Sequence, residues 1–449
     1  MTPQIALYGS LYGSDAMRRI FALPERLRAL AAVEAALARA QARLGIVPQS
    51  AADAIVAAAG EVDTFDVGAM VAATENVGYP VVPLTKELAK RAGGEAARYV
   101  HLGATTQDIL DTALVLQIRD ALVLLETDLR ATADALAERA RRHRDDVMAG
   151  RTHLQHALPI TFGYKVAVWL APLLDDLAAV EALRARVLQV QFGGAVGTLA
   201  SLGERGREVT VALAEELGLA VPDAPWHVDR SAFATLACAV GVACGSVAKI
   251  AGDVILLMQT EVGEVFEPHA SGRGGSSTMP QKRNPIASEY VLACTRGVHA
   301  LVPLMLTAMA DDHERSTGPW QSEEIALPQL LVLASGAFAQ ARAIAEGMTV
   351  DTARMRANLD LTGGLIMAEA VATALAASLG NAEAHQLVER ACAAAIEEKR
   401  PLLEILAHDP DVSAHVGRAE LEGLFRPESY TGESSAVVDR VLARYGTLS

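Results

Sequence analysis

The chain has 449 residues, of which 51% are hydrophobic and only 4% aromatic, so its apolar mass is mostly aliphatic. This composition argues against an all-β sandwich or barrel, which needs aromatic and β-branched strands, and against disorder, which needs an apolar-poor chain. With 39 basic and 54 acidic side chains the net charge is −15, and no concentrated basic stripe offers a surface for nucleic acid.

The first strong helical pattern runs from Pro24 to Leu44. Pro24 suits the first helical position, because the N–H that it lacks would have no partner there. Apolar residues recur on one face of this segment at helical spacing. They are Leu27, Leu30, Val33, Ala36 and Leu37. Gly and Pro interrupt the stretch that follows, up to about Arg98, which predicts several short helices.

Longer apolar patterns of helical period follow in the middle of the chain. They run from Asp108 to about Arg144, from about Thr161 to Val190, from about Arg230 to Phe266, from about Pro285 to Ala310, and from Glu324 to Gly347. Helical patterns of this length are typical of a bundle. From about Asp351 onward, Gly and Pro again divide the pattern into short helices.

The sequence therefore predicts an all-α protein of three parts. Residues 1–107 form an N-terminal helical cap domain, residues 108–350 a central long-helix bundle, and residues 351–449 a small C-terminal helical domain. The Gly-rich stretch 271–285 lies within the central part as a loop.

Targeting signals are missing from the sequence pattern. The first residues lack a basic segment followed by an apolar one, and no run of about 18 uncharged apolar residues indicates a membrane span. The four cysteines form no C-x-x-C pair and have no metal-ligand spacing with His, which favours free thiols in a reducing compartment. We therefore expect a cytoplasmic protein without a membrane partner.

Three polar stretches interrupt the helical pattern: GATTQD at 103–108, GRTHLQH at 150–156 and SGRGGSSTMPQKRNP at 271–285. The third contains three glycines that permit a flexible loop and two prolines that restrict it. Its Lys282 and Asn284, with backbone N–H groups, could hold a carboxylate while a serine acts on the ligand. The alternative is an ordinary surface loop, which the adjacent Lys282, Arg283 and Asn284 disfavour.

The segment GSSTMPQKRNP closely resembles the signature of the fumarase/aspartase superfamily, and the other two polar stretches resemble its remaining signature regions in the same order. The resemblance implies an all-α, three-domain fold with a long central helical bundle. It also implies a homotetramer in which each active site is assembled from three subunits. It implies no metal and no organic cofactor.

Within the superfamily, several segments are most similar to the bacterial 3-carboxy-cis,cis-muconate cycloisomerases, among them RYVHLGATTQDILDTALVLQIRDAL, QFGGAVGTLASLG and HERSTGPWQSE. Adenylosuccinate lyases share the GAVGT and KRNP segments, but they usually carry Ser-His where this chain has Gly318 and Pro319. The resemblance implies an intramolecular lyase that converts 3-carboxy-cis,cis-muconate, a tricarboxylate, to 4-carboxymuconolactone. That reaction belongs to protocatechuate breakdown through the β-ketoadipate pathway.

Two alternatives remain. One is adenylosuccinate lyase or a related C–N lyase that releases fumarate. The other is a non-catalytic helical structural protein, which has no reason to keep Ser276, Lys282, Asn284 and His153 together in polar segments.

The resemblance implies that Ser276 donates or accepts the proton at the reacting carbon. A free hydroxyl is a weak base, so Lys282 and aligned N–H groups would have to lower its pKa. His153 is the rival acid/base residue, because imidazole titrates near working pH. We predict Ser276, His153 and Lys282 as catalytic residues and leave the division of proton transfer between Ser276 and His153 open.

The other predicted site residues bind substrate, and Arg315 is the candidate clamp for a distal carboxylate. Arg315 could instead pair with Asp311 or Glu314. The predicted substrate-binding residues are Thr105, Thr106, Gln107, Arg151, Ser277, Asn284 and Arg315. Glu289 occupies a position where many superfamily members place a carboxylate that bonds the catalytic His, and its alternative is an exposed helix residue. His101, beside GATTQD, is a further candidate functional residue.

Overall fold

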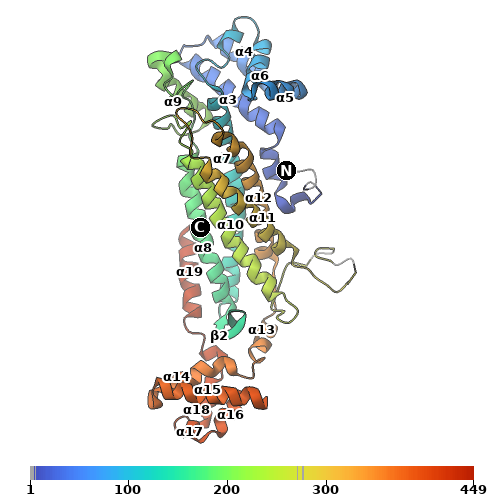
Figure 1. The fold of residues 1–449 in the computed structure, drawn as a ribbon, viewed down its shortest axis with the longest axis vertical. Helices are drawn as coiled ribbons and strands as arrows, with labels where there is room; N and C mark the ends of the chain where they lie inside the picture. The colour runs from blue at the N-terminus through green and yellow to red at the C-terminus, as the bar shows by residue number, and fades with distance from the viewer. Residues whose placement is uncertain (1–4, 6, 270–271, 276–277, 449) are drawn as a thin grey trace. The chain divides into compact units, whose positions relative to one another are not determined.

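The computed structural model describes Ile5 and residues 7–269, 272–275 and 278–448. Helices make up most of this part of the chain (Figure 1), and the fold is the all-α class that the sequence predicts. The chain separates into two compact units. Unit 1 contains 1–129, 176–245 and 290–340, and unit 2 contains 130–175, 246–289 and 341–449. The three-part division drawn from the sequence stays a prediction.

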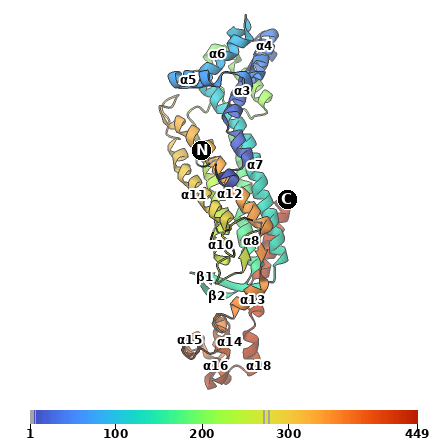
Figure 2. The ribbon, with the colours of Figure 1, turned by 90° about the vertical axis from the view of Figure 1, so that its right-hand side faces the viewer.

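Short helices begin unit 1, and α3 is the longest of them. Its predicted inward face is confirmed, since Leu30, Val33 and Leu37 are at most 1% exposed. Helices α4 and α9 both pack against α3. Helix α6 packs against α4 and α5, and Figure 2 shows α4, α5 and α6 close together. The elements are η1 (Gly9–Tyr12), α2 (Asp15–Ile20), α3 (Leu23–Arg43), α4 (Gln49–Gly60), η2 (Val62–Thr64), α5 (Val67–Val77), α6 (Val81–Ala92), η3 (Ala96–Tyr99), η4 (Ala200–Arg205) and α9 (Gly206–Leu217).

Long helices contribute residues to both units. They are α7 (Thr106–Arg142), α8 (Phe162–Val187), α10 (Ser231–Leu257), α11 (Ile286–Thr307) and α12 (Pro319–Gly347). Each matches a long helical pattern in the sequence, with one correction. The pattern expected to reach Phe266 ends at Leu257, where a turn passes through Gly263 (φ +61°). The strand β3 (Val265–Phe266) then pairs with β4 (Thr349–Val350).

Unit 2 contains a hairpin that the helical patterns do not predict. Strands β1 (Val147–Thr152) and β2 (Gln155–Thr161) are antiparallel and fill the gap between α7 and α8. The polar stretch GRTHLQH thus lies on a two-stranded ribbon and its turn, where the sequence indicated only a break between helices. Helix α13 packs against β1 within the same unit.

Short helices complete unit 2. Residues such as Leu375, Leu402 and Leu406, each 0% exposed, form a core among the last helices. The elements are α13 (Thr352–Leu359), η5 (Leu365–Met367), α14 (Ala368–Leu379), α15 (Asn381–Glu398), α16 (Leu402–His408), α17 (Pro410–Ser413), α18 (Arg418–Leu424), η6 (Pro427–Ser429) and α19 (Ser434–Leu448).

A buried ionic cluster joins three long helices within unit 1. Arg230, at the start of α10, is 1% exposed and donates to Asp111 of α7 (2.8 and 3.0 Å) and to Glu323 of α12 (3.0 Å). The indole N–H of Trp320 also donates to Asp111 (3.2 Å). Burial raises the pKa of the Glu323 carboxyl to about 7. The attraction of Arg230 opposes this rise, and the negative charges of Asp111 and Asp311 add to it.

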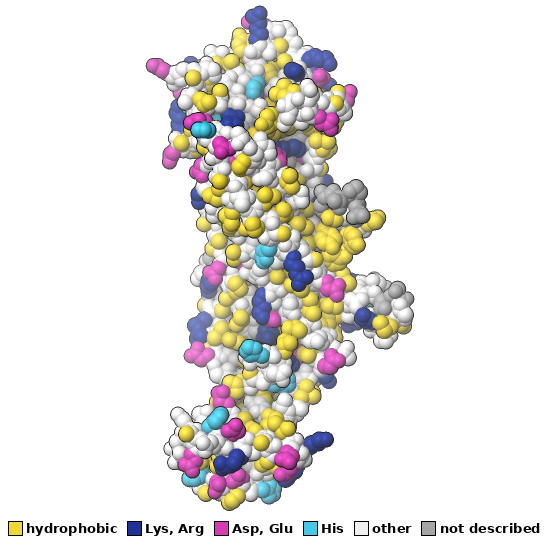
Figure 3. All heavy atoms as spheres, viewed as in Figure 1, with side chains coloured by type: hydrophobic (Ala, Val, Ile, Leu, Met, Phe, Trp, Pro, Cys, Tyr) yellow, Lys and Arg dark blue, Asp and Glu magenta, His cyan; other side chains and the backbone are white. Residues whose placement is uncertain are grey.

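Among the described residues, three of the long helices are also strongly apolar. By length and composition alone α10, α11 and α12 could each cross a membrane, which corrects the expectation that no segment would meet that criterion. Each of these helices contains an 18-residue apolar stretch. This stretch is 50% buried in α10, 28% buried in α11 and 67% buried in α12. Val242 on α10, Leu306 on α11 and Ile325 on α12 are 48–64% exposed. Hydrophobic side chains are also open to view on the face drawn in Figure 3.

Candidate active site

The first polar stretch forms the start of α7, in unit 1. The Thr105 N–H donates to the Asp108 carboxylate (2.9 Å), which is one of the two bonds of a capping box, and the Asp108 N–H donates to the Thr105 carbonyl oxygen (3.0 Å). The same carboxylate accepts the N–H groups of Gly193 and Gly194, both at 2.9 Å, and contacts His227 Nε2 at 2.6 Å. Asp108 is fully buried, so it fixes the 193–194 loop beside the helix start.

Arg315 lies over this helix start. Its guanidinium donates to the Thr105 hydroxyl (3.3 Å) and to the carbonyl oxygens of Gly194 (3.5 Å) and Ala195 (2.8 Å). Among the residues that the structure describes, no carboxylate lies within ion-pair distance of Arg315, so the alternative pairing with Asp311 or Glu314 is not seen. All of its described partners are neutral, which leaves the charge of Arg315 available for a ligand carboxylate.

The neighbouring predicted residues differ in how open they are. Thr105 and Thr106 are half-buried, whereas Gln107 is 0% exposed and donates its amide N–H to the carbonyl oxygen of His227 (2.8 Å). Gln107 therefore connects the helix start to the 227 loop in this structure. Its role in substrate binding stays a prediction.

His101, just before this helix, contacts a buried carboxylate. Its Nδ1 lies 2.6 Å from Glu34 Oε1 of α3, and Glu34 is 1% exposed. Burial lowers the pKa of His101, but the hydrogen bond and the charge of Glu34 outweigh it, so the pKa is raised above its ordinary 6.5. The ring therefore favours its protonated form in the folded chain more than in the unfolded chain.

This pair predicts a pH-dependent stability. Because the pKa of His101 is higher in the folded state, its contribution is complete below about pH 6.5 and is lost as pH rises through the folded value. We expect Glu34→Gln to lower the free energy of unfolding mainly at the acidic end of a urea-unfolding series from about pH 6 to about pH 9. Replacing the exposed His415 by Gln is the control. A difference between wild type and Glu34→Gln that does not vary with pH would contradict this prediction.

The second polar stretch forms the β1–β2 hairpin of unit 2. His153 (φ +50°) and Leu154 (φ +64°) are its two-residue turn, and both side chains are exposed. Arg151 on β1 donates both guanidinium ends to Glu264, at 2.9 and 2.7 Å. Arg151, predicted to bind substrate, is thus paired with a carboxylate in this structure, in contrast to Arg315. Its predicted role is not tested by this pairing.

The third polar stretch forms a loop that is closed near its base, also in unit 2. Gly275 and Arg283 make an antiparallel bridge, and the Asn284 N–H donates to the Gly274 carbonyl oxygen (2.9 Å). Gly274 has φ +67°, and a Cβ there would lie 2.6 Å from the Asn284 carbonyl oxygen, so only glycine fits. Arg283 packs over the Phe266 ring and donates to the Glu267 carbonyl oxygen (3.3 Å).

The loop leads into α11, whose N-terminus is capped by Glu267. This buried carboxylate accepts the N–H groups of Ala287 (3.0 Å) and Ser288 (2.7 Å), a favourable place for negative charge. Lys282 and Glu289 are exposed, and Asn284 is half-buried. Ser276 and Ser277 lie outside the described residues.

The predicted residues therefore form two groups. Thr105 and Arg315 are in contact in unit 1, while the hairpin and the loop belong to unit 2. Among the described residues, no hydrogen bond joins His153 to Lys282, Asn284 or Glu289. The sequence did not predict His227 or Glu264 as site residues, and it predicted no role for Asp108, the last residue of GATTQD. The T-x-x-D capping box was the available signal for Asp108; for His227 and Glu264 we find none.

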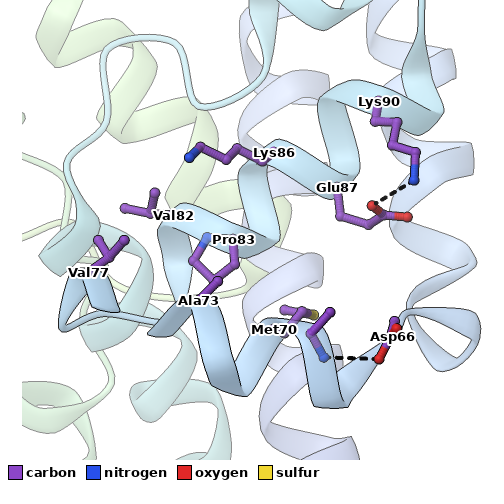
Figure 4. A pocket seen from close by; sticks show the side chains of 10 residues that line it. Asp66, Met70, Ala73, Val77, Val82, Pro83, Lys86, Glu87 and Lys90 are labelled. Carbon is purple, nitrogen blue, oxygen red and sulfur yellow. Dashed lines mark hydrogen bonds and ion pairs between the residues drawn. The ribbon is translucent and has the colours of Figure 1, made fainter. Parts of the chain in front are cut away.

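A separate pocket of about 240 Å³ lies between α5 and α6 in unit 1 (Figure 4). Met70, Ala73 and Pro83 line it, and Lys86 extends away from the Glu87–Lys90 ion pair. None of the predicted site residues lines this pocket. Within the described ranges, no group of three or more His, Cys, Asp or Glu side chains is placed to hold a metal ion.

The chain is similar to known proteins over nearly its whole length. The profile of a family described as Lyase matches residues 12–299, and one described as Adenylosuccinate lyase C-terminus matches residues 364–441. The chain is 46% identical to 3-carboxy-cis,cis-muconate cycloisomerase from Pseudomonas aeruginosa, with 99% of this chain and 98% of the relative covered. It is 43% identical to nitrosuccinate lyase from Streptomyces davaonensis, with 93% and 90% covered. The solved 3-carboxy-cis,cis-muconate lactonizing enzyme from Pseudomonas putida superposes with a TM-score of 0.94 at 46% identity, covering 98% of this chain and 99% of that chain.

Proposed function

Because this chain belongs to the lyase family, the fumarase/aspartase superfamily, we propose that it converts 3-carboxy-cis,cis-muconate to 4-carboxymuconolactone. The observation that carries the proposal is the full-length identity of 46% to a cycloisomerase, with a matching fold at a TM-score of 0.94. The reaction has a place in protocatechuate breakdown through the β-ketoadipate pathway.

The reaction is an isomerisation, so all atoms of the substrate stay in the product. One carboxylate oxygen adds to a C=C carbon, and the π electrons move toward a second carboxylate on the adjacent carbon. That carbon then takes up a proton. The state between these steps is an aci-carboxylate with doubled negative charge, and cations with hydrogen-bond donors around it lower its energy.

The residues of this chain supply those groups. His153 or Ser276 delivers the proton to the carbon, and Lys282 and Asn284 of the loop stabilise the aci-carboxylate. Arg315 and the hydroxyls of Thr105 and Thr106 bind a carboxylate away from the reacting carbon. Support for this assignment comes from Arg315, whose described partners are all neutral, and from the exposure of His153 and Lys282.

We propose further that the active chain is a homotetramer whose sites each use residues of three subunits. The apolar and mostly uncovered surface of α11 supports a second copy as its cover, because such a surface is costly in water. Light scattering should report four chains. Mixing an inactive His153 variant with an inactive Lys282 variant, followed by refolding together, should restore activity, since some mixed sites then hold both intact residues. A monomer, or no restored activity, would contradict this proposal.

The activity is tested by mixing the purified chain with 3-carboxy-cis,cis-muconate and following the loss of the diene absorbance. A C–N lyase is the second candidate, favoured by the 43% identity to nitrosuccinate lyase. Nitrosuccinate, adenylosuccinate and argininosuccinate therefore complete the substrate panel. Turnover of one or more of these three compounds, without turnover of 3-carboxy-cis,cis-muconate, would overturn the cycloisomerase assignment in favour of the C–N lyase.

The lyase family consists of enzymes that act on small molecules, and its relationship to this chain implies neither a membrane nor a nucleic acid as partner. We place the protein in the cytoplasm, in keeping with its free cysteines. Fractionation of cells that express the full chain should recover it with the cytoplasmic fraction.

A further inference from the structure

The turn that carries His153 has an unfavourable backbone. His153 and Leu154 connect Thr152 to Gln155 as a two-residue hairpin loop, and both have φ in the left-handed region. Such turns favour Asn and Gly, because other side chains crowd the backbone at positive φ. Both side chains of the turn are exposed, so contacts below the turn must hold it in place.

One of these contacts is the bidentate pair between Arg151 and Glu264. Arg151 lies two residues before His153, and its planar guanidinium meets the carboxylate with two parallel hydrogen bonds of 2.7 and 2.9 Å. Glu264 is 0% exposed. A fork of this kind fixes orientation as well as distance, which a single contact to a lysine would not do.

Glu264 is itself held by other elements of unit 2. The side chain of Asn358 on α13, which is 1% exposed, donates to Glu264 Oε1 (2.7 Å). The backbone N–H of Asp351 donates to the Glu264 carbonyl oxygen (2.9 Å), and the Glu264 N–H donates to the Leu257 carbonyl oxygen (2.9 Å). The hairpin is therefore connected through Arg151 to a carboxylate that α10, α13 and the β4 end keep in one place.

From this geometry we propose that Glu264 is a positioning residue for His153, acting through Arg151. The inference rests on the proposed function only in taking His153 as the acid/base group. Loss of the fork frees the base of the hairpin, and a displacement of the imidazole by about 1 Å can cost on the order of 100-fold in rate. Arg151 then serves catalysis by holding the hairpin and not by binding a substrate carboxylate.

The test measures kcat, KM and the unfolding midpoint for three variants. We expect Glu264→Gln and Arg151→Lys to lower kcat by roughly 10- to 100-fold, because each removes the fork. KM should change by less than about threefold, since His153 acts in the chemical step. Glu264→Gln also leaves Arg151 without its carboxylate, so its unfolding midpoint should fall.

The double variant Arg151→Met with Glu264→Leu separates positioning from stability. It removes both charges, so its unfolding midpoint should lie closer to wild type than that of Glu264→Gln. Its kcat should nevertheless stay as low, because the hairpin remains without its fork. A purely structural role predicts that activity returns together with stability.

Asp253→Asn is the matched control. Asp253 is another carboxylate of unit 2, accepts the indole N–H of Trp169 (2.7 Å), and has no hydrogen bond to the hairpin. We expect kcat to stay within about threefold of wild type. Rates are compared on whichever substrate of the panel the wild-type chain turns over. The activity of the wild type tests the proposed function, and the ratio of variant kcat to wild-type kcat tests this inference. A Glu264→Gln variant or a double variant with wild-type kcat would overturn it.

Discussion

Replacing His153 by Asn should lower kcat by roughly 10²- to 10⁴-fold, the range that a positioned acid/base residue supplies. Asn is the informative substitution because it tolerates positive φ better than most residues, and His153 has φ +50° at an exposed turn. The unfolding midpoint should therefore stay close to that of wild type. Steady-state kinetics and urea unfolding of the same preparation measure both quantities.

His156, on β2 of the same hairpin, provides the matched control. It is half-buried, and burial followed by the charge of Arg151 lowers its pKa. His156→Asn should leave kcat within about tenfold of wild type, because this ring is not at the turn. If His153→Asn keeps wild-type kcat, His153 is not the acid/base group and Ser276 is left with that role. If Ser276→Ala has wild-type kcat instead, Ser276 has no part in the proton transfer and His153 is the acid/base group.

Replacing Arg230 by Met should destabilise the fold by about 3–5 kcal/mol, the usual cost of removing one partner from a buried ionic cluster. Asp111 and Glu323 are each 1% exposed, and the variant leaves both without their cation. Denaturant unfolding at one protein concentration measures the change, since the stability of the proposed tetramer would depend on concentration.

The sign of its pH dependence follows from the same cluster. Burial already raises the pKa of Glu323 to about 7 against the attraction of Arg230, so without the guanidinium Glu323 holds its proton still more tightly in the folded state than in the unfolded state. The deficit of Arg230→Met should therefore shrink as pH falls toward about 5 and grow as pH rises. Arg39→Met is the control, because Arg39 and Glu216 form a surface pair (2.8 Å) worth about 0–1 kcal/mol. A loss for Arg230→Met as small as for Arg39→Met would contradict the prediction.

Much of the fold could be predicted from the sequence because helices record their environment locally. The apolar spacing of α3 identified Leu30, Val33 and Leu37 as inward residues, and all are buried. The same periodicity failed between 258 and 266, because α10 ends at Leu257, a turn follows up to Gly263, and β3 then pairs with β4, a strand more than 80 residues away. A pairing partner at that distance leaves no mark in local spacing.

The candidate site divides in the same way. The family could be recognised from the sequence alone, because the residues of GSSTMPQKRNP and of GATTQD are contiguous along the chain. The roles of the site residues in these segments stay predictions. The pairing of Arg151 and Arg315 with their described neighbours could be learned from the three-dimensional structure alone. Arg151 is paired with Glu264, 113 positions along the chain, whereas the described partners of Arg315 are all neutral oxygens. The physical reason is that a charge is neutralised by its neighbours in space, and those neighbours come from segments that the fold alone brings together.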